Sequence, residues 1–281
     1  MTADLHLHTY YSDGNWSPAE VVDAAIKFGF QCMAITDHDT VAGLDEAREA
    51  AADHIRLIDG IEMNCIWVNP DGERQDVHIL GYFIDKASPA LKDAMDKQQE
   101  ARMNYVRETL DRLREKGHKI ELDDVISAAG KGSIGRPHVC AAMLKAGVTR
   151  DIQNAYRMLM NRDSEYRVIR RSITPQDAIK AIRAAGGISS LAHPGKDDFI
   201  PELVKELQDS GLQAIEAYHR GHTNTQVRKY LKLARDKGML ATGGSDCHGP
   251  YKEYPATIGT VRIPPDIVKA LDAFRETNAA H

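Results

Sequence analysis

The stretch Ala3-Asp4-Leu5-His6-Leu7-His8-Thr9 has the pattern of a short buried strand, and it carries two histidines. Successive side chains of a strand point to opposite faces, so His6 and His8 share one face and the two leucines share the other. Two imidazoles about 6–7 Å apart along a strand can bind one metal ion. A pair of partly exposed strand histidines would give the same pattern, so the rest of the chain has to decide between the two interpretations.

Length and composition limit the class of protein. A chain of 281 residues that is 42% hydrophobic can form one large core, or one barrel domain with an insertion. A net charge of −5 gives no global basic signature, and we expect no duplex nucleic acid as a partner. Four scattered cysteines without a C-x-x-C pair indicate a reduced, cytoplasmic protein. We expect no signal peptide and no membrane segment, because no apolar run approaches about 18 residues.

Strand and helix patterns alternate on both sides of one helical region. A capping box at Ser17-Pro18-Ala19-Glu20 begins the first expected helix. Further strands are expected at 31–36, 55–61, 77–84, 188–192, 214–217 and 239–243. Further helices of this alternating part are expected at about 41–53, 175–185, 201–210, 225–237 and 265–276. The interrupting region contains four helical stretches at 89–116, 122–129, 136–146 and 150–161, with no convincing strand.

About seven strand–helix units, interrupted once, predict a parallel sheet that closes or nearly closes into a barrel. We place the first part of the barrel at 1–87, an all-helical insertion at 88–170, and the second part of the barrel at 171–281. The active site of such a barrel lies at the C-terminal ends of its strands. His78 departs from this pattern, because it lies early in its expected strand.

Histidines and carboxylates recur near these strand ends. The candidate metal ligands are His6, His8, Asp13, His38, Glu62, His78, His193, Asp246 and His248. A set without cysteine suits Zn²⁺, Mn²⁺ or Fe²⁺ in a reactive centre better than a structural zinc. Nine groups exceed what one ion needs, so we expect two or three divalent ions, with Glu62 able to bridge a pair. Metals about 3.5–4 Å apart favour attack on phosphorus by a bridging hydroxide.

The chain resembles the PHP (polymerase and histidinol phosphatase) family, in its group of stand-alone metal-dependent phosphoesterases. The resemblance rests on the stretches DLHLHTYYSDG, ITDHDT, GIEMN, VHILGY, IGRPHV, LAHPG, IEAYHRGHT and TGGSDCHG, which run in order from Asp4 to Gly249. It implies a distorted seven-stranded (β/α)7 barrel with an all-helical insertion. It also implies three metal positions, held by His6, His8, Glu62 and Asp246, by Glu62, His78 and His193, and by Asp13, His38 and His248.

The resemblance also suggests residues that contact the substrate. Arg136 resembles the family's phosphate-binding arginine, and its planar guanidinium suits bidentate contact with phosphate. Lys196 stands where close relatives often have arginine, and it can still act as a point charge. His222 resembles a position near the leaving group, where it would contact the substrate or act as general acid. Glu216 is expected to point into the barrel mouth without being a ligand. Because Arg136 lies in the insertion and all nine metal candidates lie outside it, we expect the insertion to cap the substrate.

We therefore expect a hydrolase of phosphoric ester bonds that acts through a metal-bridging hydroxide. Its partner would be a small phosphorylated substrate, either a nucleotide or sugar phosphate (mono- or diester) or a short oligonucleotide. The alternatives are a cyclic phosphodiesterase or 5′–3′ oligoribonuclease acting on short 5′-phosphorylated ends, a histidinol-phosphate phosphatase, and a non-catalytic metal-binding module. The complete set of ligand positions argues against the non-catalytic module, and the insertion with its GRPH stretch argues against the histidinol-phosphate enzyme.

Overall fold

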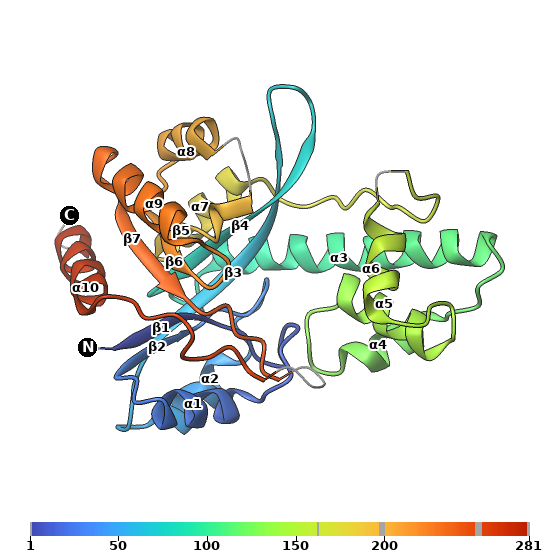
Figure 1. The fold of residues 1–281 in the computed structure, drawn as a ribbon, viewed down its shortest axis with the longest axis horizontal. Coiled ribbons are helices and arrows are strands. Elements are labelled where there is room, and N and C mark those ends of the chain that lie inside the picture. Colours follow the sequence, from blue (N-terminus) through green and yellow to red (C-terminus); the bar gives the residue numbers. More distant parts are fainter. Residues whose placement is uncertain (1, 162, 197–199, 251–254, 280–281) are drawn as a thin grey trace. The chain divides into compact units, whose positions relative to one another are not determined.

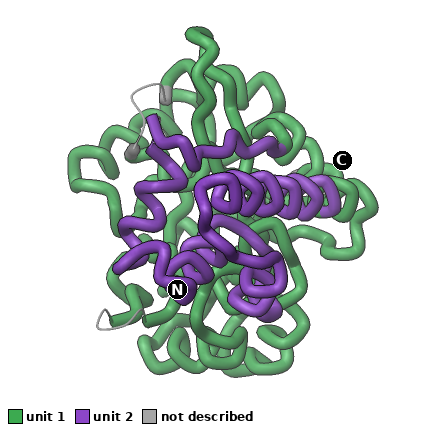
Figure 2. Tube along the Cα trace, turned by 90° about the vertical axis from the view of Figure 1, so that its right-hand side faces the viewer, with its two compact units in different colours: residues 1–95, 173–281 green, residues 96–172 purple. Residues whose placement is uncertain are grey.

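The computed structural model describes residues 2–161, 163–196, 200–250 and 255–279, and the chain divides into two compact units. Unit 1 comprises Met1–Met95 and Ile173–His281, and unit 2 comprises Asp96–Ser172 (Figure 2). Unit 2 begins later than the predicted insertion at residue 88. The reason is that Leu91 and Ala94, in the first turns of the long helix α3 (Pro89–Glu115), are buried in the core of unit 1.

Unit 1 is built on one seven-stranded sheet whose strands follow chain order (Figure 1). The strands are β1 (Ala3–Leu7), β2 (Cys32–Ile35), β3 (Arg56–Val68), β4 (Arg74–Tyr82), β5 (Ile188–Leu191), β6 (Ala214–His219) and β7 (Leu240–Gly244). The two edges meet at a parallel bridge between Leu7 and Cys247, where the His8 N–H donates to the Cys247 carbonyl at 2.9 Å. The sheet is therefore a nearly closed barrel, which confirms the predicted α/β fold class.

Strand β4 departs from the predicted parallel order. It runs antiparallel to both β3 and β5, so the expectation of a wholly parallel sheet is wrong at this point. Strand β3 continues to Val68, and a tight turn from Asn69 to Gly72 leads directly into β4 with no crossover helix. Strand β4 begins at Arg74, earlier than expected, so His78 lies at the middle of the strand and not near its start. His78 pairs with Asn64 of β3, and its carbonyl accepts a hydrogen bond at 3.0 Å from the N–H of Ala192, the residue after β5.

Helices cover the outside of the sheet. In unit 1 they are α1 (Pro18–Lys27), α2 (Leu44–Ala51), α7 (Pro175–Ala184), α8 (Ile200–Asp209), α9 (Asn224–Asp236) and α10 (Pro265–Ala279). The predicted capping box is present at α1, where the Ser17 side chain accepts from the Glu20 N–H and the Glu20 carboxylate accepts from the Ser17 N–H. The apolar stripe of α1 packs Val21, Val22 and Ala25 into the core, so burial and capping both fix the loop that leads into the helix.

Among its described residues, unit 2 contains helices joined by loops and no strand, and it has a core of its own. Most of α3 belongs to it, together with α4 (Leu122–Ala129), α5 (Arg136–Lys145) and α6 (Ile152–Met160). Its apolar cluster includes Val106, Leu113, Val125, Val139 and Met143.

All four cysteines, at positions 32, 65, 140 and 247, are buried free thiols. Within the described ranges, none of the helices combines the length and the apolar character needed to cross a membrane.

The barrel closes where Gly244 in β7 passes against β1. A Cβ added at Gly244 would lie 2.4 Å from the Cβ of His6 and 2.4 Å from its backbone nitrogen. We predict that Gly244→Ala lowers the free energy of unfolding by about 1–3 kcal/mol, because the barrel is overpacked there. An unconstrained strand glycine gains about 0.5–1 kcal/mol on the same change, so the sign of the effect is diagnostic. Urea denaturation measures it, and a gain in stability would contradict the close approach.

Candidate metal centre

Four of the predicted ligands meet at one end of the barrel. His6 and His8 come from β1 and the residue after it, Glu62 from β3, and Asp246 from the loop after β7. The His6 Nε2 atom lies 3.1 Å from His8 Nε2 and 3.2 Å from Glu62 Oε2. Asp246 Oδ1 lies 3.5 Å from His6 Nε2 and 3.2 Å from His8 Nε2. Tetrahedral ligand atoms about 2.1 Å from an ion are about 3.4 Å apart, so these spacings suit one ion.

The other oxygen of Glu62 faces a second pair of histidines. Glu62 Oε1 lies 2.9 Å from His78 Nδ1 and 3.0 Å from His193 Nε2. The side chain of Glu62 is fully buried. One carboxylate therefore places an oxygen in each of two adjacent donor groups, which is the arrangement that a bridging ligand needs.

A third group forms around Asp13. Its Oδ1 atom lies 3.1 Å from His248 Nε2 and 3.8 Å from His38 Nε2. Together with His8, these three residues offer donor atoms that all lie within 4.8 Å of one another. The structure thus brings all nine predicted metal residues together in overlapping donor groups, and His38 also lies close to Glu62. The division of these residues among three positions stays a prediction. That each residue binds an ion stays a prediction.

Divalent ions fit this arrangement. Among the described residues, Glu62 Oε2, Asp13 Oδ1 and His38 Nδ1 are buried atoms without a hydrogen bond. Glu62 Oε2 and His38 Nδ1 approach to 3.0 Å, yet their directions are not those of a hydrogen bond. A buried polar atom without a hydrogen bond costs about 1–3 kcal/mol. These atoms belong to the donor groups around Glu62 and Asp13, so cations bound in those groups would satisfy them. Mixed imidazole and carboxylate donors suit Mn²⁺, Fe²⁺ or Zn²⁺.

The pKa values of the clustered residues also favour the binding of divalent ions. Burial raises the pKa of Glu62, but the imidazoles of His38 and His6 hold that pKa well below its usual value. Burial lowers the pKa of His248, but the Asp13 carboxylate outweighs it and raises the pKa to about 10. The pKa values of His6, His8 and His248 are thus raised beside ionised carboxylates, and divalent ions that bind there would displace protons from these rings.

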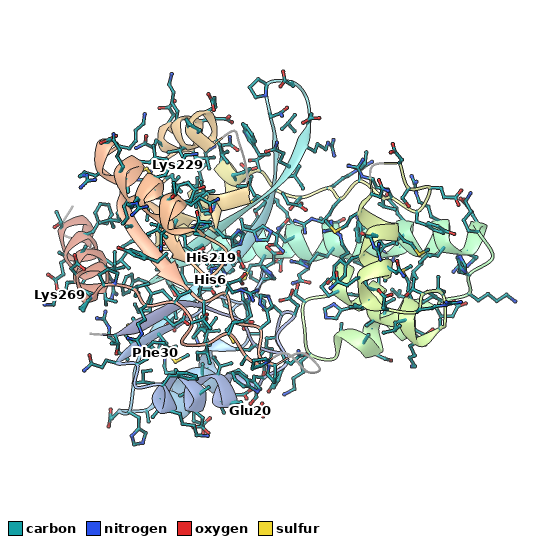
Figure 3. All side chains as sticks on the ribbon, in the orientation of Figure 1. His6, Glu20, Phe30, His219, Lys229 and Lys269 are labelled. Carbon is teal, nitrogen blue, oxygen red and sulfur yellow. The ribbon has the colours of Figure 1, made fainter. Side chains whose placement is uncertain are left out.

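Two buried residues outside the predicted ligand set contact predicted ligands. Glu216, on β6, places Oε1 3.0 Å from His6 Nδ1. The ring of His219 lies 6.3 Å from that of His6, centroid to centroid, and both residues are labelled in Figure 3. Nδ1 of His219 accepts from the Gly221 N–H, and its Nε2 lies 3.4 Å from Asp246 Oδ2. From the sequence, Glu216 is recognisable only as a polar residue in a buried strand. The only sequence signal for His219 is its place in the run HRGH.

The backbone around the centre is strained and braced. His193 and Asp246 have positive φ angles of 27° and 51°, a region that residues other than glycine rarely adopt. The loop that carries Asp13 is held by Asp37, which accepts hydrogen bonds from the backbone and hydroxyl of Thr9 and from the hydroxyl of Ser12. Strain of this kind persists only where the surrounding structure enforces it, and it concentrates at functional sites.

His222 is held by two backbone groups. Its Nδ1 donates to the Ala217 carbonyl at 2.9 Å, and its Nε2 accepts from the Gly195 N–H at 3.0 Å. Burial lowers the pKa of His222, so the ring is neutral. Contact with a substrate through Nε2 would require the bond to Gly195 to break. The predicted role of His222 as substrate contact or general acid stays a prediction.

The other two predicted substrate contacts lie elsewhere in the chain. Lys196 ends the short 3-10 helix η1 (Pro194–Lys196), and its side chain lies outside the described residues. Arg136 is the first residue of α5 in unit 2, and its guanidinium carbon lies 5.7 Å from the ring centroid of Tyr105. Both roles stay predictions.

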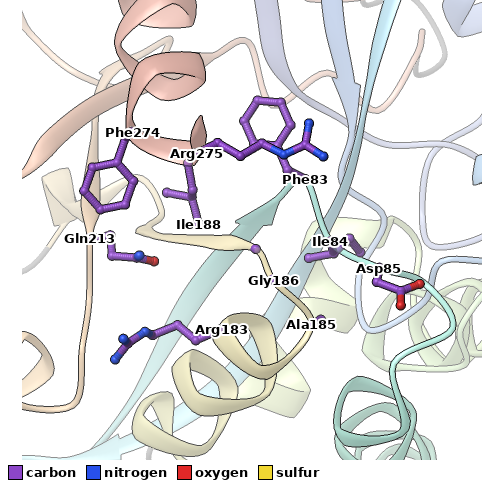
Figure 4. Close-up of a pocket in the computed structure, with 11 residues that line it drawn as sticks. Phe83, Ile84, Asp85, Arg183, Ala185, Gly186, Ile188, Gln213, Phe274 and Arg275 are labelled. Carbon is purple, nitrogen blue, oxygen red and sulfur yellow. The ribbon is translucent and has the colours of Figure 1, made fainter. Parts of the chain in front are cut away.

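A separate cavity of about 510 Å³ lies where β5 and β6 begin (Figure 4). Phe83, Arg183, Ile188, Gln213, Phe274 and Arg275 are among its lining residues. The nine metal candidates are not among the described residues that line it. In parallel β/α barrels chemistry belongs to the opposite end, where the parallel strands finish.

The chain is similar to several characterised proteins. The PHP domain model matches residues 4–135. The 3′,5′-nucleoside bisphosphate phosphatase of Chromobacterium violaceum is 32% identical over 260 residues, which cover 88% of this chain and 87% of that protein. The phosphoribosyl 1,2-cyclic phosphate 1,2-diphosphodiesterase of Eggerthella lenta is 32% identical, with coverage of 91% and 97%. The 5′-3′ exoribonuclease Rnm of Salmonella typhimurium is 31% identical, with coverage of 88% and 85%.

Solved structures agree with this result. A Bifidobacterium adolescentis protein, provisionally described as a metal-dependent phosphoesterase, superposes with a TM-score of 0.83 at 31% identity. The match covers 96% of this chain and 94% of that one.

We predict that protein purified without chelator contains two or three transition-metal ions per chain, because nine buried or partly buried donor residues converge in overlapping groups. Removing the ions should lower the melting temperature, and Mn²⁺ should restore it, since an ion at 100 times its Kd adds about 2.7 kcal/mol. Elemental analysis and thermal melts measure both effects. Asp246→Asn should lose at least one ion, whereas His54→Gln, at an exposed histidine, should lose none. Less than one ion per chain in the wild type, with no stabilisation by Mn²⁺, would refute the prediction.

Proposed function

This chain belongs to the PHP domain family and is a metal-dependent phosphoesterase, and we propose that it hydrolyses a small phosphorylated metabolite, a nucleotide or sugar phosphate. The observation that carries the proposal is the carboxylate of Glu62, whose two oxygens face two adjacent donor groups at 2.9–3.2 Å. Such a carboxylate holds a pair of ions at a fixed short separation. A paired centre of this kind is typical of enzymes that act on phosphate esters.

The charge of the ligand set suits an anionic substrate. With neutral histidines the nine candidates carry three negative charges, on Asp13, Glu62 and Asp246. Two or three divalent ions leave this set net positive, so it attracts a phosphate ester. When bound, such ions activate water and neutralise charge on the phosphoryl oxygens. We propose two or three ions of Mn²⁺, Fe²⁺ or Zn²⁺.

Fixed cations of the chain add to this attraction. Within unit 1, Arg220 places its Nη2 atom 3.9 Å from Asp246 Oδ2, and its side chain is 43% exposed. The guanidinium can therefore contact an incoming phosphate while it remains beside the ligand Asp246. For Arg136 of unit 2 and Lys196 of unit 1 we retain the proposed role of phosphate contacts, because the resemblance to the family places phosphate-binding residues at these positions.

The names of the relatives support a substrate with a phosphorylated end. One relative is named for a nucleoside bisphosphate, one for a ribosyl cyclic phosphate and one for RNA digested from its 5′ end. We propose a mono- or diester at the end of a small molecule as the first candidate. A 5′-phosphorylated oligoribonucleotide is the second candidate, favoured by the match to the exoribonuclease over 88% of this chain. We also retain the proposal of a cytoplasmic enzyme.

A substrate panel tests the proposal. We expect Mn²⁺-loaded protein to hydrolyse p-nitrophenyl phosphate weakly, and to hydrolyse strongly one of three natural classes: a nucleoside 3′,5′-bisphosphate, a sugar cyclic phosphodiester, or a short 5′-phosphorylated oligoribonucleotide. Histidinol phosphate is included to test the alternative that the protein is a histidinol-phosphate phosphatase. Phosphate release and chromatography of the products measure the rates. Asp246→Asn, purified in parallel, controls for contaminating phosphatases. A folded, metal-loaded protein that hydrolyses nothing in the panel would instead be a non-catalytic metal-binding module.

We predict that Arg136→Ala lowers kcat/KM for the preferred natural substrate by roughly 10²-fold and leaves the metal content unchanged. The loss of a charge-assisted bidentate contact to phosphate costs about 1.5–3 kcal/mol. Arg136→Lys should recover part of the loss, because lysine keeps the charge without the planar fork. Arg157→Ala is the matched control, since this exposed arginine of the same unit bonds to Asn154. Unchanged kinetics in Arg136→Ala would make Arg136 an ordinary surface residue.

A further inference from the structure

One carboxylate outside the ligand set contacts two of the predicted ligands at once. Glu216 lies on β6 inside the barrel and has no exposed surface. Its Oε1 atom lies 3.0 Å from Nδ1 of His6, and its Oε2 atom accepts a hydrogen bond from the backbone N–H of His193 at 2.7 Å. His6 belongs to the first donor group, and His193 belongs to the second. Glu216 thus contacts one member of each donor group, at atoms other than those that would bind an ion.

The contact to His6 decides which nitrogen of that ring can bind an ion. The carboxylate of Glu216 can only accept at Nδ1, so Nδ1 must carry the proton. The lone pair of the neutral ring is then on Nε2, which is the atom that faces His8, Glu62 and Asp246. A carboxylate behind a ligating histidine also fixes the ring's orientation and raises its basicity.

The contact to His193 acts on the backbone instead. His193 has a φ of 27°, which is unfavourable for a residue with a side chain. The hydrogen bond from its N–H to Glu216 is buried and charge-assisted, and so it is of the stronger class. This bond helps to hold the strained backbone from which the His193 ring reaches Glu62 Oε1 at 3.0 Å.

We propose that Glu216 is a positioning residue that prepares two metal positions at once, through the ring of His6 and the backbone of His193. The inference rests on the metal centre of the proposed function, but it assigns a role to a residue outside that centre. In the described part of the chain, Asp13, His38 and His248 of the third group make no hydrogen bond or ion pair with Glu216, so this group should not depend on it.

Glutamine is the informative replacement, because it has the same shape and cannot serve both contacts. If the amide oxygen faces His6, the amide N–H₂ group meets the His193 N–H, and two donors oppose each other. If the oxygen faces His193, the amide donates to His6 Nδ1. The proton of His6 must then move to Nε2, where it blocks metal binding. In either orientation at least one of the two positions is weakened.

We expect Glu216→Gln to weaken metal binding by about 10–100-fold at the affected position, as is usual when a partner behind a ligand is removed. At a free Zn²⁺ concentration that just saturates the wild type, the variant should hold at least one ion fewer per chain. Titrations with buffered Zn²⁺ and elemental analysis measure this without any activity assay. Glu216→Asp keeps the charge but is shorter, so it should show an intermediate loss. Tyr82→Phe, which removes another fully buried polar group from the same barrel, is the control and should keep all ions.

A measurement on the wild type keeps the proposal testable even if the variants misfold. In the Zn²⁺-loaded protein, ¹⁵N NMR of the histidine rings should show His6 protonated at Nδ1 and ligated through Nε2. The opposite arrangement would overturn the inference. Equal Zn²⁺ binding by wild type and a folded Glu216→Gln would overturn it as well, while leaving the metal centre intact. A wild type that binds no Zn²⁺ would instead overturn the metal centre, and this inference with it.

Discussion

The rest of the centre depends on the interaction between the buried carboxylate of Glu62 and the imidazoles around it. A buried carboxylate is costly unless positive charge or strong donors surround it. Glu62 is surrounded by imidazoles from both sides, with His6 and His8 near one oxygen and His78 and His193 near the other. Those four residues come from three strands or their ends, β1, β4 and β5. The packing of the barrel therefore also provides the imidazoles that compensate the buried charge of Glu62.

The reversed direction of β4 contributes to this arrangement of imidazoles around Glu62. In a wholly parallel barrel each strand brings only its last residues to the active end. The hairpin of β3 and β4 instead brings together Glu62, from the middle of one strand, and His78, from the middle of the next. Neighbouring strands can therefore supply facing ligands without a helix between them. The strained backbones of His193 and Asp246 complete the set from the loops that follow β5 and β7.

Much of this could be predicted from the sequence, because the relevant signals are local. The alternation of His6 and His8, the capping box at Ser17 and the polar residues after buried strands indicate the barrel and its active end. The antiparallel direction of β4 follows from the tight turn at 69–72 and from the extension of β3 to Val68, whereas the local pattern predicts that this strand ends at residue 61. The pairing of β4 with β5, more than a hundred residues later, is not a local signal. Glu216 reads as a polar residue in a buried strand until His6 is placed 3.0 Å away, across 210 residues of chain.

The seam between β1 and β7 also has a consequence for how the protein is made. Asp4 accepts a hydrogen bond from the Ser245 N–H across 241 residues, and the first ligands lie beside the last ones. Ribosomal synthesis supplies His6 early and Asp246 late. For most of translation the early histidines therefore lack the partners with which they would form the proposed metal positions. Unit 2, with its own apolar cluster, can order itself during that interval. Correct metal loading is therefore a late step in the assembly of this protein, and the cell's supply of free metal at that moment bears on which ion is captured.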